Sequence, residues 1–557
     1  MKGKVSSLKK YFLFIAVIML FSSVSYGQTD LKVQAAVSNL LRYGNGYQYT
    51  GSIKNAKQYF ENLTDARFDI NGVTFGLRYN LSDSIEYGLN FKGIDKRFVE
   101  YDHESGISLR AGNFWEIISR GLALNLFEDR ALFYDTGMDG VRLTYEKLFE
   151  YKNPLRIKAQ LIGGNINYRD YLNPDRIENY KLRNAYLRVS PLKPLTLGLN
   201  YVYSNGELPE EGFLTYVNTD LPEAYININF QDLQFYADYA HKTSIITPNQ
   251  IYPDNNVAKG DGFYSSLSYS KGKFGLTMEY KNYAFDITLP DNRSNTRPSR
   301  MLPFQNPPTA VRENTSVLTS RNPHVVNFND EVGGQIDIVY TPNDKLSFNA
   351  NTSFSSTHYQ YQDIDPTSVI TYQRIDRSDA WLPDFNTAFS PFWEVYLEAE
   401  DYATEKIYAK LALSIQDNTI YNQINPSSSE IIKTTTIPLE FRYSFTEKYS
   451  LTFINETQWA SNSIRTGDKN FMNQFNSLTF SSSPKLNFTV SSEFTNDDEE
   501  PTGKNSWFTV DASYKLNESN TFGLSYGSER GGLKCTNGIC RFVQPFEGFR
   551  VLISTTY

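Results

Sequence analysis

Cysteine and histidine are scarce in this chain of 557 residues, which has two cysteines and four histidines. The cysteines lie close together, but no histidine stands at the spacing that would complete a zinc site with them. The H-E-x-x-H motif and a glycine-rich phosphate loop are also missing. The best candidate for a catalytic base, His241, has the position of an ordinary polar residue near a strand end. We therefore expect no metal site, no cofactor and no enzymatic activity.

The two cysteines, Cys535 and Cys540, flank an Asn-Gly pair. Asn-Gly is a strong signal for a two-residue hairpin turn, because both residues tolerate positive φ. In such a turn Thr536 faces Ile539, and the cysteines form the next pair, whose Cα atoms are close enough for a disulfide. The spacing predicts a stapled hairpin in an oxidising compartment, with two free thiols or half of a metal site as the alternatives.

Long apolar runs are missing after the N-terminus, so no later segment could form a membrane helix. The N-terminus itself has a lysine-rich start, an apolar run over residues 11–21 and a small-x-small sequence over residues 25–27. This order is typical of a secretory signal peptide, residues 1–27, and the run is short for a retained membrane helix. The net charge of −8 becomes more negative when the lysines of the peptide are removed, which argues against nucleic acid as a partner.

Aromatic residues, in contrast, are abundant. They make up 15% of the chain, with 40 tyrosines and 38 phenylalanines, although the mean hydropathy is only −0.46. A transmembrane β-barrel combines these properties, because its outer face is apolar and banded by aromatic residues while its lumen is polar. Composition therefore favours an all-β, antiparallel transmembrane barrel.

The hydrophobic pattern has the period of two that a strand requires. In residues 195–203, one face holds Leu195, Leu197, Leu199, Tyr201 and Tyr203. The same period recurs in segments that begin at Phe274, Leu346, Trp393, Ile407, Leu439, Leu486, Phe508 and Phe522. A soluble sandwich would also alternate, but segments of about ten residues with aromatic ends favour tilted membrane strands.

Short turns alternate with longer polar loops, as expected for periplasmic turns and extracellular loops of one barrel domain over residues 28–557. We estimate roughly 22 strands, with 14–24 possible, because residues 109–147 fit either strands with a bulge or an inward fold. Two long loops, residues 286–329 and 355–391, either enter the lumen or cover the outer mouth. The arginines of the first loop, including Arg312 and Arg321, are interpreted as solvated charges that would face lumenal carboxylates only if the loop folded inward.

Both ends of the chain are consistent with closure. Residues 31–37 have the pattern of a first strand, and the last strand places Phe549, Val551, Ile553 and Tyr557 on one face. Pairing these strands would remove the exposed edges that lipid forbids. A terminal aromatic strand resembles the insertion signal that the barrel-assembly machinery recognises. The cysteine hairpin precedes this strand, and we expect it at the extracellular rim.

Two blocks carry a family resemblance. Residues 110–114 (RAGNF) are followed by residues 120–124 (RGLAL), Glu128, Arg130 and an Asp-Gly pair, and residues 527–551 form the second block. They resemble an uncharacterised family of Bacteroidetes-type outer-membrane proteins, a domain of unknown function. The resemblance implies a barrel in the cell outer membrane of a Gram-negative bacterium, but brings no established activity or site residues.

Function then depends on the lumen. Glu394, Glu398 and Glu400 alternate with an apolar face, and Lys410 faces inward on the next strand, so carboxylates there would favour cations. Inward charges also brace large barrels, and Glu398 with Lys410 would be such a pair. We expect a porin-like passive channel for small polar solutes, with outer-membrane lipid around it. The alternative is a plugged structural or accessory barrel that docks another envelope or secretion component.

Overall fold

A computed structural model describes most of the chain. The described residues are 33–83, 90–150, 154–169, 176–210, 213–247, 256–285, 302–363, 372–375, 377, 379–422 and 425–557. The predicted signal peptide, residues 1–27, and the first part of the first long loop, residues 286–301, lie outside them. No helix in these ranges is long and apolar enough to cross a membrane.

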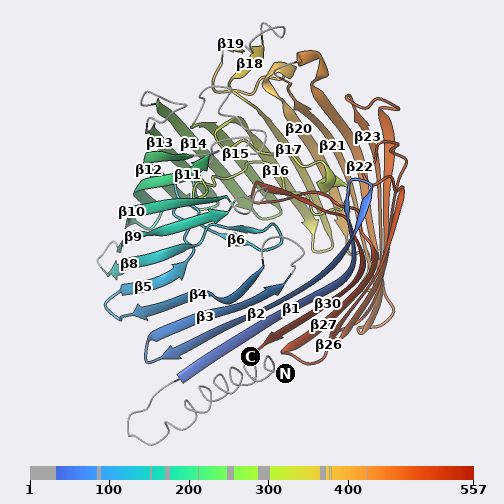
Figure 1. The fold of residues 1–557 in the computed structure, drawn as a ribbon, viewed down its shortest axis with the longest axis horizontal. Helices are drawn as coiled ribbons and strands as arrows, with labels where there is room; N and C mark the ends of the chain where they lie inside the picture. The colour runs from blue at the N-terminus through green and yellow to red at the C-terminus, as the bar shows by residue number, and fades with distance from the viewer. Residues whose placement is uncertain are drawn as a thin grey trace, which may run out of the picture.

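Within the described ranges, 24 antiparallel strands form one closed sheet (Figure 1). The predicted fold class is confirmed, and the strand number lies within the expected range but above the estimate of 22. The strands are β1 (Val33–Thr50), β2 (Ile53–Ile70), β3 (Val73–Asp83), β4 (Phe91–Asp102), β5 (Ile107–Phe114), β8 (Met138–Phe149), β9 (Leu155–Arg169), β10 (Ile177–Leu192), β11 (Leu195–Glu210), β12 (Phe213–Phe230), β13 (Leu233–Ile246), β14 (Asn256–Lys271), β15 (Phe274–Ala284), β16 (Asp330–Asn343), β17 (Leu346–Ser356), β20 (Phe392–Asp401), β21 (Ile407–Ile420), β22 (Glu430–Ser444), β23 (Tyr449–Asn462), β24 (Asn470–Ser482), β25 (Leu486–Thr495), β26 (Ser506–Lys515), β27 (Asn520–Ser528) and β30 (Phe546–Thr556).

The barrel closes between its first and last strands, which lie side by side in Figure 1. The register runs from Ser38 opposite Thr556 to Gln48 opposite Phe546. Val37 and Tyr557 also exchange two backbone hydrogen bonds of 2.9 and 2.8 Å. Closure satisfies the backbone groups of both edges, as a membrane barrel requires.

The outer wall is apolar. Large apolar side chains cover its middle, including Leu161, Leu199 and Leu411, which are 57%, 60% and 53% exposed. Aromatic side chains lie on either side, with Tyr340, Tyr514 and Phe522 near the end that holds the C-terminus and Tyr201, Tyr239 and Trp459 nearer the loops. Positions between them are polar and buried, such as Asn200. This is the surface of a transmembrane β-barrel.

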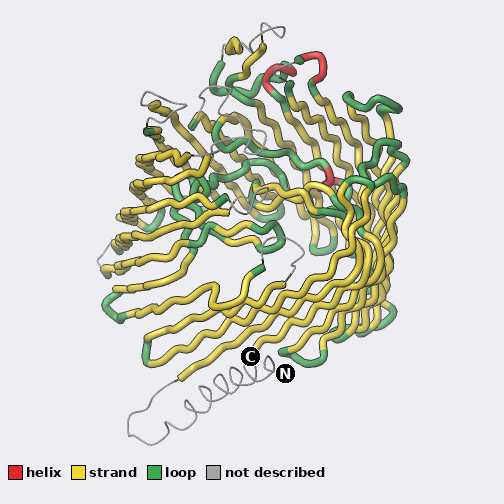
Figure 2. The backbone as a smooth tube through the Cα atoms, in the orientation of Figure 1, coloured by secondary structure: helices red, strands yellow, loops and turns green. Residues whose placement is uncertain are grey.

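Three connections at the loop end, among the described residues, turn into the barrel, where Figure 2 shows green loop segments inside the ring of strands. The first, residues 115–137, carries β6 (Glu128–Asp129) and β7 (Tyr134–Asp135). The second, residues 302–329, carries the 3-10 turn η2 (Thr319–Arg321). The third, residues 529–545, is a hairpin of β28 (Gly532–Thr536) and β29 (Ile539–Val543). We call them the first lumenal segment, the second lumenal segment and the lumenal hairpin.

The sequence left two questions open: the structure of residues 109–147 and the course of the two long loops. Residues 109–147 contain β5, an inward fold and β8, which is why a count of strands failed there. The described residues of the second long loop do not follow the first loop into the barrel. Its β18 (Gln360–Asp363) and β19 (Tyr372–Ile375) stand beyond the strand ends (Figure 1), followed by the 3-10 turn η3 (Thr387–Phe389). A further 3-10 turn, η4 (Pro426–Ser428), lies between β21 and β22.

Candidate functional site

The second lumenal segment follows the inner wall across many strands. Near its start, Tyr283 of β15 donates a 2.8 Å hydrogen bond to the carbonyl of Pro308. Asn314 donates to Glu394 of β20 at 2.8 Å, and the backbone N–H of Leu318 donates to Glu456 of β23 at 2.7 Å. A connection that is bonded to the wall at such intervals has little freedom to swing out of the lumen.

The first lumenal segment is bonded to the opposite part of the wall. Glu116 pairs with Arg142 of β8 at 2.7 Å, and the hydroxyl of Ser119 donates to Asp238 of β13 at 2.6 Å. Glu128 pairs with Arg78 of β3 at 2.8 Å. These ion pairs and hydrogen bonds hold the segment against strands from β3 to β13.

The two segments also bind each other and share an apolar core. The backbone N–H of Asn125 donates to the carbonyl of Phe304 at 2.8 Å, and the side chain of Gln305 donates to the carbonyl of Leu122 at 3.1 Å. Leu122, Leu124 and Phe304 have no exposed surface. Burial of apolar side chains is the main stabilising contribution in folded proteins, so this contact anchors both segments.

The lumenal hairpin has the predicted turn and disulfide. Its central residues, Asn537 and Gly538, have φ values of 50° and 75°, which suit Asn and Gly. Cys535 lies opposite Cys540, with Cα atoms 4.1 Å apart, and the two are joined by a disulfide. The predicted pairing is confirmed.

The predicted place of the hairpin, at the extracellular rim, is wrong. A Cβ atom on Gly538 would lie 2.3 Å from the ring of Phe328, and Ile539 is only 4% exposed, so the tip packs against the second lumenal segment. The backbone N–H of Asn537 donates to Glu313 at 2.7 Å. Local turn chemistry determined the pairing, whereas apolar contacts with a segment distant in sequence determine the position.

The hairpin spans the lumen. At its base, Arg530 pairs with Glu493 of β25 at 3.0 Å and with Glu500 at 2.7 Å. Near its other end, Arg541 donates to the hydroxyl of Tyr168 at 3.2 Å. Tyr168 belongs to β9, which is 10 positions from β25 by the shorter way around a ring of 24 strands. The hairpin thus joins nearly opposite walls.

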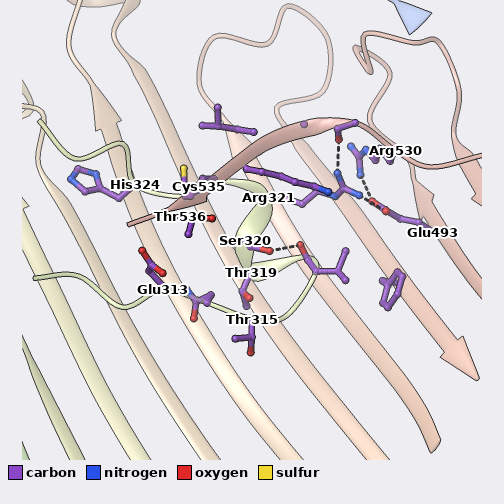
Figure 3. A pocket seen from close by; sticks show the side chains of 18 of the residues that line it. Glu313, Thr315, Thr319, Ser320, Arg321, His324, Glu493, Arg530, Cys535 and Thr536 are labelled. Carbon is purple, nitrogen blue, oxygen red and sulfur yellow. Dashed lines mark hydrogen bonds and ion pairs between the residues drawn. The ribbon is translucent and has the colours of Figure 1, made fainter. Parts of the chain in front are cut away.

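A cavity of about 540 Å³ lies between the hairpin, the second lumenal segment and the wall near β20 to β26. In Figure 3, Arg321 and Arg530 converge on Glu493, and Cys535 and Thr536 lie above the segment. Arg321 also donates to the carbonyl of Gly531 at 2.7 Å. Burial lowers the pKa of Arg321 from its ordinary value, although Glu493 favours its charged form.

A second cavity of about 320 Å³ lies between the first lumenal segment and strands β1 to β4. Its charged lining includes Lys96 and Asp135, which form an ion pair. Burial opposes ionisation of Asp135, but Lys96 and hydrogen bonds from Gly137 and Trp115 hold the pKa of Asp135 below its ordinary value. Both cavities lie beside the two lumenal segments and the lumenal hairpin, which together we call the plug.

The carboxylates predicted to line a pore do not form one ring. Glu394 faces the lumen but is only 2% exposed, because Ser414 and the second lumenal segment cover it. Glu398 accepts a 2.7 Å hydrogen bond from Tyr396, and Glu400 is part-buried on the same strand. Lys410 pairs with Glu440 at 3.4 Å rather than with Glu398.

The residues that hold the plug were largely missed by sequence reasoning. Arg312 and Arg321 are not solvated, since Arg312 pairs with Asp337 at 3.7 Å and lies over the ring of Tyr396, while Arg321 pairs with Glu493. From the sequence, these arginines were expected to face lumenal carboxylates only if the first long loop folded inward, and the described part of that loop does fold inward. Glu493 carried a signal, because it continues the polar face of the predicted segment that begins at Leu486, whereas Glu456 lies in β23, which the hydrophobic pattern did not single out.

The other singled-out residues lie on the wall. Phe549, Val551 and Ile553 pair with outward-facing residues of β27 and so face outward, and Tyr557 follows the strand; their part in insertion stays a prediction. His241 pairs with Asp261 at 2.7 Å on the outer wall. A G-x-S-x-G sequence, residues 523–527, lies in β27 rather than in the strand-to-helix turn of a nucleophile elbow.

One family model and several solved structures match this chain. A family model described as a family of unknown function (DUF6029) matches residues 8–557. The siderophore receptor PirA from Pseudomonas aeruginosa aligns over 96% of this chain and 81% of its own, with 9% identity and a TM-score of 0.45. The FrpB iron transporter from Neisseria meningitidis aligns over 94% of this chain and 81% of its own, with 9% identity and a TM-score of 0.39. No curated protein matches the sequence.

Proposed function

Because the chain belongs to the DUF6029 family, whose function is unknown, we propose a function from the geometry alone: a barrel whose lumen is plugged by its own connections and which serves as an accessory component of the envelope. The expected membership of an uncharacterised family is confirmed, while the bacterial group stays a prediction.

One observation carries the proposal: the lumenal hairpin joins β25 to β9. Arg530 and Arg541 bind side chains on nearly opposite walls, and the disulfide between Cys535 and Cys540 holds the strands of the hairpin together. A flexible loop would leave part of the cross-section open. A disulfide-linked hairpin that is bonded to the wall at both ends divides the cross-section of the lumen permanently.

The same geometry weighs against the passive channel that the sequence suggested. A porin-like lumen presents side chains to water, and its charge rings act on passing ions. Here Glu394 and Glu456 are only 2% and 3% exposed and accept hydrogen bonds from the second lumenal segment. These carboxylates hold a plug, so a free solute would not meet them.

We place this barrel in the cell outer membrane. An even number of antiparallel strands, an apolar wall and two aromatic bands support this location, as does the predicted signal peptide. Assembly there would require the barrel-assembly machinery. A barrel closed across its lumen acts through the surfaces at its two ends, so its loops or turns would bind another envelope component.

Solute entry into proteoliposomes tests the plug. Vesicles with the wild-type protein should swell no faster in a small sugar than empty vesicles, whereas a variant with a short Gly-Ser turn in place of residues 532–543 should swell measurably faster. Fast swelling with the wild-type protein would overturn the plug.

Docking is tested separately in cells. A photo-crosslinking residue at exposed Ser427, in the loop between β21 and β22, or at exposed Glu447 in a short turn, should give a discrete cross-linked band from one end of the barrel. The same residue at lipid-facing Leu411 is the matched control. The absence of bands from both ends would remove the docking role while leaving the plug intact.

A further inference from the structure

Residues 379–385, part of the second long loop, lie against the outside of the barrel. Tyr280 donates a 2.6 Å hydrogen bond to the carbonyl of Trp381, and Asn282 donates to the carbonyl of Ala380 at 2.9 Å. Both donors alternate on β15 with Lys281, which binds the second lumenal segment and so faces inward. Tyr280 and Asn282 therefore face outward, and we call residues 379–385 the outer flap.

The flap covers polar groups on the outer wall. Asp330 of β16 accepts a 3.0 Å hydrogen bond from the His358 ring, whose other nitrogen contacts Asn282 at 2.9 Å. The hydroxyl of Ser356 accepts from the backbone N–H of Asp384 at 2.9 Å. Polar groups on a lipid-facing wall are costly unless protein groups satisfy them. The flap and its neighbours provide these partners.

The outer surface of the flap is apolar and exposed. Trp381, Leu382 and Phe385 are 64%, 63% and 57% exposed. The carboxylate of Asp379 accepts hydrogen bonds from the backbone N–H groups of Trp381 and Leu382 at 2.7 and 3.3 Å. The apolar side chains are therefore presented on a fixed backbone.

The flap also continues an aromatic band of the barrel. Asn282 lies opposite Phe263, and Phe263 lies opposite Tyr239, which is 48% exposed. The flap is bonded to the wall at the level of these residues. Tryptophan and tyrosine concentrate where a membrane meets water, because their rings are apolar and their polar atoms stay hydrated.

We propose that the outer flap inserts Trp381, Leu382 and Phe385 into the boundary between headgroups and acyl chains of the surrounding lipid, and so fixes the depth of this side of the barrel. The ligand is lipid, and the binding surface is the flap, which is separate from the plugged lumen. Continuity with the aromatic band supports lipid over a protein partner.

Quenching of tryptophan fluorescence tests the proposal. The protein is reconstituted in phosphatidylcholine vesicles whose acyl chains carry bromine, near the headgroup in one preparation and deep in another. The emission of Trp381 is obtained by subtracting the spectrum of Trp381→Phe from that of the wild-type protein. The emission of Trp459, which is 50% exposed on the wall, is obtained in the same way from Trp459→Phe and serves as the matched reference. Trp381→Phe keeps the backbone carbonyl that Tyr280 binds.

Shallow bromine should quench Trp381 within about twofold of its effect on Trp459, and more than deep bromine does. Quenching of Trp381 by aqueous iodide but not by brominated lipid would overturn the proposal. Protection from both quenchers would also overturn it and would indicate a second copy of this chain. If Trp381→Phe fails to fold, Leu382→Cys with an environment-sensitive label gives the same reading.

Discussion

Arg530 of the lumenal hairpin lies 3.0 Å from Glu493 of β25, and both side chains are more than nine-tenths buried. Arg321 of the second lumenal segment pairs with the same carboxylate. One wall residue thus holds two inward connections that are more than 200 positions apart in sequence. Ion pairs join the plug to the wall at this carboxylate, so a single substitution of Glu493 tests the attachment.

Glu493→Gln should destabilise the protein and loosen the hairpin. The substitution leaves the charges of Arg321 and Arg530 buried without their shared partner, which costs about 3 kcal/mol in the free energy of unfolding. Urea unfolding from vesicles, followed by tryptophan fluorescence, measures it. Glu440→Gln is the matched control, because the pair of Glu440 with Lys410 is more exposed and contributes less than about 1 kcal/mol. Equal effects of the two substitutions would contradict the assigned role of Glu493.

The disulfide should be present in the purified protein and should stabilise the hairpin. Non-reduced protein is expected to be lighter than reduced protein by the mass of two hydrogens, located to Cys535 and Cys540. Replacing both with serine should lower the free energy of unfolding by about 2 kcal/mol, because the disulfide closes a short loop and so removes only a modest amount of conformational entropy from the unfolded chain. Free thiols in the non-reduced protein would refute the pairing.

Closure of the barrel depends on a close approach of backbones between β1 and β30. A Cβ atom on Gly46 would lie 2.1 Å from the carbonyl oxygen of Glu547 and 2.7 Å from the Cα of Gly548. Gly46→Ala should therefore lower the free energy of unfolding by about 1–3 kcal/mol. Gly163→Ala, where a Cβ meets nothing within 4 Å, should leave it nearly unchanged. A larger loss from Gly163→Ala would contradict the position of the closing seam.

Acid should separate two loops at the loop end of the barrel, the loop between β23 and β24 and the loop between β25 and β26, over a narrow range of pH. Hydrogen bonds from the Gly467 and Thr466 backbone and the Thr466 hydroxyl lower the pKa of Glu499 from 4.5 to about 2. A carboxylate with a lowered pKa stabilises the folded state above its ordinary value, and the contribution disappears as pH falls to about 2. Pepsin should therefore cut residues 463–469 slowly at pH 4 and faster near pH 2. Glu499→Ala should be cut fast at both pH values, and a wild-type rate that does not change would argue against this contact.

Much of the fold follows from local pattern. Alternation in residues such as Leu197 and Leu199 predicts strands and their outward faces, because a strand has a period of two. The Asn-Gly turn predicts the partner of Cys535, because turn type fixes hairpin register. These features depend on residues that are close in sequence.

The plug does not follow from local pattern. Arg321 has the appearance of a solvated loop charge, and its structural role comes from partners that are distant in sequence: Glu493, 172 positions away, and the carbonyl of Gly531. Leu122 and Phe304 likewise form a core only because two loops meet. Such contacts depend on which connections turn inward, and the hydrophobic periodicity of the strands does not predict this. The lumenal carboxylates were predicted from the pattern of one strand, whereas the exposure of Glu394 is decided by Asn314 and Ser414, which lie on other elements.

Single-channel conductance in a planar bilayer tests the plugged lumen most directly. Folded wild-type protein should show no steady openings, whereas the variant with a short turn in place of residues 532–543 should conduct. Steady openings in the nanosiemens range from the wild-type protein would contradict the plug and restore the passive channel.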